Sequence, residues 1–554
     1  MQNNLITPIT ILVNQSLATG IFPEKLKIAK VIPLFKKNDD EIMNNYRPIS
    51  LLPVFSKIFE KVAQIQLSEY LRNNNLLFDS QHGFRENHST ESAVIELVDY
   101  LKIQIDNKHI PMCLFLDLSK AFDTINFDIL LLKLQHLGIN NMALNWFENY
   151  LTNRKQFVTF NEVDSILLET KTGVPQGSVL GPLLFLIYIN DLNNVSDFFK
   201  VICFADDSTL IISLCFTAGR CQFCNNNNNF GSNLINEELE KIFNWFCINK
   251  LSINPDKTKY ILFKNKQRNL SNLLLPVLRL DGKILEQVNE FLYLGTYLDE
   301  DLTWEPHINY ISNKISKNIG ILKRLKFTVP LNILKTLYFS LIHPYINYSI
   351  LAWGYNLNRI EKLQKQSIRV ITDSYYLQHT NNLFQQLKIL KIEDIFKLKQ
   401  FLFYHKFINN SLPSSLSGIL TSQTNDLRAC HSAYFLRPAI LANTEAAKQC
   451  IRHSIPELIN DKDNKTFIEY ISDKSLPSVK KLFKDITILT YESECTDESC
   501  YPCKSRFFSP YGFTSGLRHL HIFYYLRSFT FHKPFLSTGI LKFLNIFNYI
   551  NIPH

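Results

Sequence analysis

The sequence lacks any apolar run long enough to cross a membrane. A spanning helix needs about 18 to 20 apolar residues, and even the aromatic stretch after His519 is interrupted by Arg527, Lys533 and Lys542. The first residues also lack the basic segment, apolar segment and cleavage site of a secretory signal peptide. These absences predict an intracellular protein without a membrane partner.

A strong charge imbalance is absent too. The 59 Lys and Arg residues are nearly matched by 50 Asp and Glu residues, which leaves a net charge of +9. Such a balance indicates only a mild preference for polyanions. The eleven cysteines are scattered, and several lie in apolar runs, as Cys113 and Cys203 do. That distribution indicates reduced cysteines and not a disulfide framework.

The 554 residues leave room for about two to four domains. Short strand patterns alternate with helix patterns over the first two thirds of the chain, which predicts mixed α and β structure. Segments with helical spacing or helical end signals are 55–71, 89–101, 130–144, the run from 183 to 191, 235–246 and 308–325. After Asp373 the pattern predicts helices but carries no diagnostic motif.

Two acidic features interrupt this pattern. Asp117 ends a bulky apolar run that predicts a buried strand, and Asp206 and Asp207 lie at the tip of a predicted hairpin over 201–213. If these strands are neighbours in an antiparallel sheet, the three carboxylates lie close together and need a cation to stay ionised. Hard oxygen ligands favour Mg²⁺. The alternative is that Asp117 caps a helix and the other two fill turn positions.

Three motifs in order decide between these alternatives. Residues 115–123 (FLDLSKAFD), 173–182 (GVPQGSVLGP) and 204–207 (FADD) resemble motifs A, B and C of reverse transcriptases. The continuation of motif B, LLFLIYIND over 183–191, is similar to jockey-like non-LTR (LINE-type) retrotransposons. The resemblance covers roughly residues 21–354.

The resemblance implies an α+β fold in the form of a right-hand polymerase with fingers, thumb and an antiparallel palm sheet, followed by a mainly helical C-terminal region. It implies an RNA-directed DNA polymerase that uses an RNA template, a DNA primer, dNTPs and two Mg²⁺ ions, with Mn²⁺ as a substitute. An element protein of this kind is expected in the nucleus and the cytoplasm.

The resemblance also assigns the chemistry. Asp117, Asp206 and Asp207 match the catalytic metal ligands. Lys257, in a segment that resembles motif D, matches a lysine that assists proton transfer to the pyrophosphate. An exposed turn lysine is the alternative reading of Lys257.

Five residues are expected to contact the nucleotide. Arg47 and Arg85 lie in segments that resemble fingers motifs, and a planar guanidinium suits phosphate oxygens. Phe122 matches the aromatic that crowds the sugar 2′ position. Gln176 and Gly177 match a loop that lies against template and nucleotide, where a missing side chain permits close approach. The alternatives are surface arginines and an ordinary core phenylalanine.

Downstream, Tyr293, Leu294 and Gly295 lie in a segment that resembles the primer grip. The basic residues from Lys314 to Lys326 then fit a thumb helix that follows phosphates without reading sequence. A solvated helix face is the alternative. The expected domains are the fingers, 1–112; the palm with an interleaved fingers segment and an Asn-rich loop at 215–233, 113–264; the primer grip and thumb, 265–372; a helical region, 373–490; and a Cys-containing tail, disordered in one reading, 491–554.

Elements of this type normally carry an endonuclease, and neither end of the sequence suggests one. We therefore expect a truncated copy, with a decayed or co-opted copy that only binds nucleic acid as the alternative function. Group II intron maturases and viral RNA polymerases are less similar, since the latter usually present Gly-Asp-Asp. Two cysteine groups have spacings that zinc sites also use, although a zinc site is not the favoured reading of either: Cys221 with Cys224, and Cys495, Cys500 and Cys503 with His519 or His521.

Overall fold

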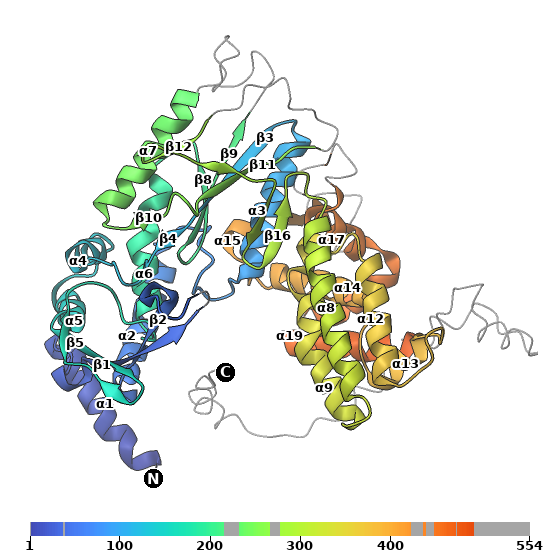
Figure 1. Ribbon diagram of the computed structural model, residues 1–554, viewed down its shortest axis with the longest axis horizontal. Coiled ribbons are helices and arrows are strands. Elements are labelled where there is room, and N and C mark those ends of the chain that lie inside the picture. The colour runs from blue at the N-terminus through green and yellow to red at the C-terminus, as the bar shows by residue number, and fades with distance from the viewer. Residues whose placement is uncertain are drawn as a thin grey trace, which may run out of the picture.

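The computed structural model describes residues 2–36, 39–214, 232–265, 277–422, 436–438, 442, 448–472 and 474–491. Its fold is mixed α and β: two larger sheets with their helices, and a region of helices to one side (Figure 1). No helix in the described part of the chain is both long and apolar enough to cross a bilayer.

The first sheet lies toward the N-terminal end of the molecule (Figure 1). Its order is β2-β1-β5-β6, and β7 pairs with β5. The strands are β1 (Ile28–Phe35), β2 (Tyr46–Leu51), β5 (Arg154–Phe160), β6 (Val163–Asp164) and β7 (Leu168–Thr170). The accompanying helices are α1 (Gln2–Thr19), α2 (Val54–Asn73), α4 (Phe127–His136) and α5 (Asn141–Leu151).

The central sheet has the order β14-β11-β3-β9-β8. All its pairings are antiparallel except that of β11 with β14. The strands are β3 (Ile110–Leu116), β8 (Lys200–Phe204), β9 (Asp207–Leu214), β11 (Lys259–Leu262) and β14 (Glu286–Gln287). The helices of this part are α3 (Thr90–Asp106), α6 (Gly181–Ile189) and α7 (Ser232–Ile248).

The continuous apolar run of β3 is explained by burial on both faces of the sheet. Cys113 and Phe115 point into a core that contains α3, whereas Met112 and Leu114 point into a second core that contains α6 and α7. Successive side chains of a strand alternate between faces, so a strand covered on both sides needs apolar residues at every position. The prediction of a buried strand here is confirmed.

Five of the six helices predicted from local signals are present, and one prediction is wrong. The helix predicted over 55–71 is α2, and α3 begins after Ser89, whose side chain forms a capping box with Ser92. The single helix predicted over 130–144 is wrong, because α4 ends at His136 and α5 begins at Asn141. Gly138 between them has φ +92°, a left-handed conformation that ends the helix.

The helical region follows a hairpin of β15 (Glu290–Tyr293) and β16 (Thr296–Asp299), which contains the segment that resembles the primer grip. Its helices are α8 (Glu305–Leu325), α9 (Leu331–Leu341), α10 (His343–Asn347), α11 (Ile350–Trp353), α12 (Asn358–Ile371), α13 (Asn381–Leu387), α14 (Ile392–Ile408), α15 (Ser414–Ser417), α17 (Ile451–Asn460), α18 (Lys465–Ile471) and α19 (Leu476–Thr490).

One continuous core joins the helical region to α3 and the central sheet. It runs from Phe115 through Ile315 of α8 to Phe401 of α14 and ends at Tyr491, the last described residue. The expected domain boundaries stay a prediction. Two expected segments lie mostly outside the described residues. They are the Asn-rich loop expected at 215–233 and the tail expected at 491–554, of which residues 492–554 are not described.

Candidate active site

The three predicted metal ligands come together through the pairing of β3 with β9. The register ends with Leu116 opposite Ser208, so Asp117 and Asp207 are the next residues on the two adjacent strands. Asp206 lies beside them in the turn between β8 and β9, where Ala205 has φ +55°. The predicted neighbourhood of the two strands is therefore present, and the role of the three residues as metal ligands stays a prediction.

The electrostatics of the carboxylates show that they are close enough to interact. Burial, together with the charges of Asp206 and Asp117, raises the pKa of Asp207 to about 6. Burial also raises the pKa of Asp206, where the charge of Asp117 adds to the effect and the cations Arg47 and Lys36 oppose it. Cations of the first sheet thus act on the acidic hairpin of the central sheet.

The donor set suits a hard divalent cation. Carboxylate oxygens are the ligands that Mg²⁺ prefers, and crowded carboxylates with raised pKa values gain ionisation when a cation is added. Among the described residues, no group of three or more His, Cys, Asp or Glu side chains is arranged closely enough to hold a metal ion by itself. The three acids are therefore neighbours but not a closed cage.

The tip of the acidic hairpin is held in place by Gln81. Its Oε1 accepts hydrogen bonds from the backbone N–H groups of Ala205, at 3.0 Å, and Gly83, at 2.8 Å. A Cβ atom on Gly83 would lie 2.3 Å from the backbone nitrogen of Ala205, so only glycine permits this approach. Cys203 of β8 continues the contact through its N–H to the carbonyl of Ser80.

Lys257 lies beside Asp117, and its role in proton transfer stays a prediction. The short strand β4 (Leu118–Ser119) pairs with β10 (Ser252–Ile253), and the Asn254 N–H donates to the Asp117 carbonyl at 2.9 Å. The Lys257 Nζ then lies 3.4 Å from Oδ2 of Asp117. Both side chains are accessible to solvent, at 67% and 42% exposed.

Phe122 is fixed between two other rings. It stacks on Phe185 of α6 with a centroid distance of 4.7 Å and meets Phe84 edge-on at 6.4 Å. Phe122 is half-buried and packs against the core that contains α6, whereas Phe84 is 57% exposed. The role of Phe122 at the sugar 2′ position stays a prediction.

Motif B is bound to motif A through Gln176. The Gln176 Nε2 lies 2.8 Å and 3.0 Å from the two carboxylate oxygens of Asp123. Gly177 has φ +121°, and a Cβ there would lie 2.7 Å from the Ser50 carbonyl oxygen of β2. The close approach that this glycine permits is therefore to the main chain of the first sheet, whose Ser50 N–H also donates to the Gln176 carbonyl.

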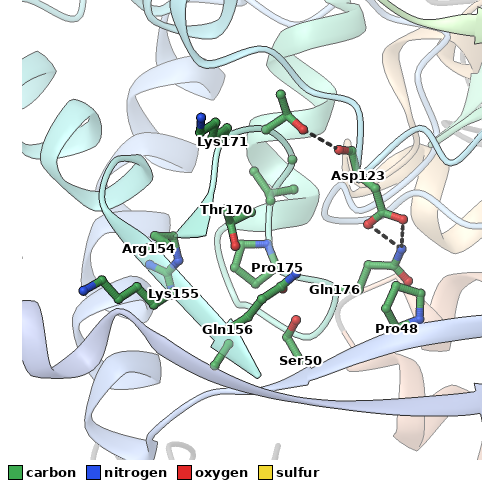
Figure 2. Close-up of a pocket in the computed structure, with 14 residues that line it drawn as sticks. Pro48, Ser50, Asp123, Arg154, Lys155, Gln156, Thr170, Lys171, Pro175 and Gln176 are labelled. Carbon is green, nitrogen blue, oxygen red and sulfur yellow. Dashed lines mark hydrogen bonds between the residues drawn. The ribbon is translucent and has the colours of Figure 1, made fainter. Parts of the chain in front are cut away.

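A cavity of about 250 Å³ lies between the first sheet and the motif B loop (Figure 2). Ser50 and Gln156 line it from the sheet, Pro175 and Gln176 line it from the loop, and Asp123 lines it from motif A. Lys155 and Lys171 also contribute to its wall, which gives the cavity a positive balance.

The two arginines predicted to bind phosphate have different surroundings. Arg47 is exposed on β2, opposite Leu34 of β1, and its charge reaches Asp206. Arg85 is half-buried, and its Nη1 donates to the carbonyl of Phe78 at 2.7 Å and to that of Gln81 at 3.2 Å. Arg85 therefore supports the loop that carries Gln81, and its contact with phosphate stays a prediction.

The three residues predicted to form the primer grip also differ in their surroundings. Leu294 and Gly295 form the hairpin turn, with φ of +44° and +82°. Tyr293 is only 3% exposed and packs on Phe115, so its side chain supports the hairpin from within the core. Tyr348 of the helical region holds the turn, because its hydroxyl donates to the Leu294 carbonyl at 2.5 Å.

The basic stripe predicted on α8 is accessible. Ile308, Ile311 and Ile315 of this helix are buried, whereas Lys314 and Lys317 on its other face are exposed. Whether the stripe contacts phosphates stays a prediction. Both cysteine groups considered for zinc lie outside the described residues.

Sequence reasoning missed four residues that position the site. Three of them are Gln81, Asp123 and Tyr348, described above. The fourth is Glu60 of α2, a fully buried side chain whose Oε2 accepts from the Val179 N–H at 2.6 Å. Burial raises the pKa of Glu60. An acid in the apolar face of a predicted helix was the only signal for it.

Comparisons with known proteins agree with the motifs. Residues 35–298 match the family model for reverse transcriptase (RNA-dependent DNA polymerase). The chain is 30% identical over 401 residues to the probable RNA-directed DNA polymerase from transposon BS of Drosophila melanogaster, covering 70% of this chain and 43% of the relative. It is 26% identical over 402 residues to the RNA-directed DNA polymerase from mobile element jockey of Drosophila funebris, covering 70% and 42%.

The chain thus spans less than half the length of these curated relatives. Among solved structures, apo telomerase from Candida tropicalis aligns with a TM-score of 0.36 at 10% identity, covering 79% of this chain and 75% of that one.

Proposed function

We propose that this chain, which belongs to the reverse transcriptases of jockey-like non-LTR retrotransposons, extends a primer 3′ hydroxyl with dNTPs on an RNA template. The observation that carries the proposal is the pairing of β3 with β9, which brings Asp117 beside Asp207 and the hairpin tip. The raised pKa values of Asp206 and Asp207 support it, since they indicate a site built for added positive charge.

Asp117, Asp206 and Asp207 would hold two Mg²⁺ ions, for which Mn²⁺ can substitute. Such ions, when bound, activate the attacking hydroxyl and neutralise charge on the triphosphate. The protein's own part in phosphoryl transfer is positioning and charge complementation. Arg47 and Lys36, whose charges reach Asp206, supply fixed cations for the phosphates.

Phe122 and Gln176 set the shape of the nucleotide site in this proposal. The ring of Phe122, fixed between Phe84 and Phe185, closes the space where a ribose 2′ hydroxyl would lie. Gln176, held by Asp123, presents the motif B loop toward template and nucleotide. Lys257 beside Asp117 is placed to give a proton to the leaving pyrophosphate.

In the same proposal the first sheet corresponds to fingers, the central sheet to the palm, and α8 with its neighbours to the thumb. The thumb and the hairpin of β15 and β16 would hold the primer. An RNA template and a DNA primer are then the macromolecular partners, and an element ribonucleoprotein in nucleus and cytoplasm is the expected setting.

Primer extension tests the proposal. Purified full-length chain is given a labelled DNA primer on an RNA template with dNTPs and Mg²⁺, and Asp206→Ala is compared with Asp128→Asn, an exposed acid of α4. We expect template-directed extension by the wild type and Asp128→Asn and none by Asp206→Ala. Equal inactivity of all three would overturn the proposal and leave a nucleic-acid-binding copy as the function.

A further inference from the structure

The end of the helical region carries a cluster of exposed aromatic and apolar side chains. Phe327 follows α8 and is 78% exposed, while Tyr375, Tyr376 and Leu377 follow α12 and are 87%, 78% and 84% exposed. Large apolar side chains gathered on a protein surface usually mark a binding site. We call these four residues, with the cations described below, the tip surface.

Hydrogen bonds within the loop of the tip surface constrain its conformation. The Ser374 N–H donates to the Arg369 carbonyl at 2.9 Å, and the Gln378 N–H donates to the Tyr375 carbonyl at 3.0 Å. The Arg369 Nε closes the loop with a bond of 2.8 Å to the Gln378 carbonyl. A preorganised aromatic surface loses little entropy when it binds.

Two chain segments far apart in sequence are joined at this surface. Lys326 at the end of α8 forms an ion pair of 2.5 Å with Asp373, which has φ +50° at the start of the loop. The same ammonium lies 4.4 Å from the centre of the Phe327 ring. The pairing therefore brings the end of α8, with Phe327 next to it in the chain, to the start of the loop that carries the two tyrosines.

The charge around the rings is positive. Lys323 and Arg324 are exposed in the last turn of α8, and the positive charge of Arg369 lies close enough to Tyr376 for the two groups to interact. The acid of this segment, Asp373, is already paired with Lys326. Exposed rings among cations are complementary to a ligand that has both flat faces and negative charge.

We propose that the tip surface binds a single strand of nucleic acid. Unpaired bases stack on Tyr375 and Tyr376, and Lys323 and Arg324 contact the phosphates. Stacking of this kind is sequence-tolerant because every base has a π face. In Figure 1, α12 and α13 lie on the side of the helical region away from the central sheet, so the loop that carries the tyrosines is separate from the acidic hairpin.

An apolar protein partner would also cover the rings, but it would gain nothing from the surrounding cations. Charge complementarity therefore favours the nucleic acid. The inference goes beyond the proposed polymerase activity, since it concerns a strand outside the catalytic centre.

Fluorescence anisotropy with a labelled 20-nucleotide single strand, RNA or DNA, tests the inference on the full chain without dNTPs. We expect Tyr375→Ala/Tyr376→Ala to weaken binding by roughly tenfold or more, and Tyr375→Phe/Tyr376→Phe to bind like the wild type. Lys323→Gln/Arg324→Gln should lower the slope of log affinity against log salt by about 0.7 for each lost phosphate contact. The matched control is Ile248→Ala, a side chain 74% exposed on α7.

The inference would be overturned if Tyr375→Ala/Tyr376→Ala bound the strand as tightly as the wild type. It would also be overturned if Tyr375→Phe/Tyr376→Phe lost as much affinity as the alanine variant. An interface for protein would give the first of these results. Because alanine variants can fold poorly, photocrosslinking of a 4-thiouridine strand to the wild type is a second measurement, and the peptide over 369–378 should carry the crosslink. If the chain extends no primer but the loss of both tyrosine rings still weakens binding of the strand, the polymerase proposal fails and this inference stands.

Discussion

The amide of Gln176 lies across the whole carboxylate of Asp123, with its Nε2 at 2.8 Å and 3.0 Å from the two oxygens. These residues belong to motifs B and A, 53 positions apart in the chain. Their contact joins the loop that lies on the first sheet to the strand that carries Asp117. The active-site geometry therefore depends on a hydrogen bond made by two residues outside the metal centre.

The first prediction concerns this pair. Asp123→Ala or Gln176→Ala alone should lower kcat/KM for dNTP about tenfold, because a hydrogen bond to a charged group contributes about 1.5 to 3 kcal/mol. The double variant should be little worse than either single variant, since the two residues act through one contact. Steady-state single-nucleotide incorporation measures all four proteins, and additive losses would contradict the coupling.

The second prediction concerns charge repulsion at the hairpin. Asp207→Asn removes one of three crowded carboxylates. Without Mg²⁺ it should raise the free energy of unfolding by about 1 kcal/mol once screening by water is included, and the melting temperature should rise with it. Adding Mg²⁺ should stabilise the wild type more than the variant, because a ligand of the folded state raises its stability. Calorimetry with and without EDTA measures this, and an equal response in both proteins would count against the metal site.

The third prediction is a pH dependence that starts from Glu96. This buried carboxylate contacts His82 at 2.7 Å and Lys200 at 2.8 Å, and despite the opposing effect of burial these partners lower its pKa to about 2. A depressed carboxyl pKa stabilises the fold above the unfolded value of 4.5, and the contribution is lost as the pH falls from there toward 2.

Urea unfolding between pH 7 and pH 3.5 tests that dependence. Removing the charge with Glu96→Gln should lower stability by roughly 3 kcal/mol at pH 7 and flatten the loss of stability in acid. Glu148→Gln, an exposed acid of α5, is the matched control and should leave the pH profile unchanged. Parallel profiles for Glu96→Gln and the wild type would rule out this role of Glu96.

The fourth prediction concerns sugar selection. Replacing Phe122 by valine opens the space between Phe84 and Phe185, so ribonucleotides should be accepted more readily. The ratio of kcat/KM for dNTP to that for rNTP is expected to fall by about tenfold or more. Phe84→Leu, which alters the neighbouring exposed ring, should change the ratio less. An unaltered ratio in Phe122→Val would show that Phe122 is only a packing residue.

Much of the site was accessible from sequence because its parts are local. A strand that ends in Asp117, a hairpin that bears Asp206 and Asp207, and the turn at Leu294 and Gly295 each leave a pattern within a few neighbouring residues. Their order then sufficed to assign the motifs. The break at Gly138 was missed because the apolar spacing continues across it.

The positioning contacts were not accessible in this way. Gln81 reaches the N–H of Ala205, and Tyr348 reaches the carbonyl of Leu294. Bonds from a side chain to a distant backbone group have no periodic signature, so no spacing rule finds them. The orientation of Arg85, toward carbonyl groups of its own loop, is likewise decided by tertiary packing.

The central claim is that Asp117 and Asp206 act in one catalytic centre. Single-turnover incorporation of one dNTP on an RNA template, with Asp117→Asn, Asp206→Asn and the double variant, tests this most directly. Residues that act as a unit show strongly non-additive losses, so each single variant should lose about a thousandfold or more in rate and the double variant little more. Near-wild-type rates in either single variant, or losses that multiply in the double variant, would contradict a shared centre.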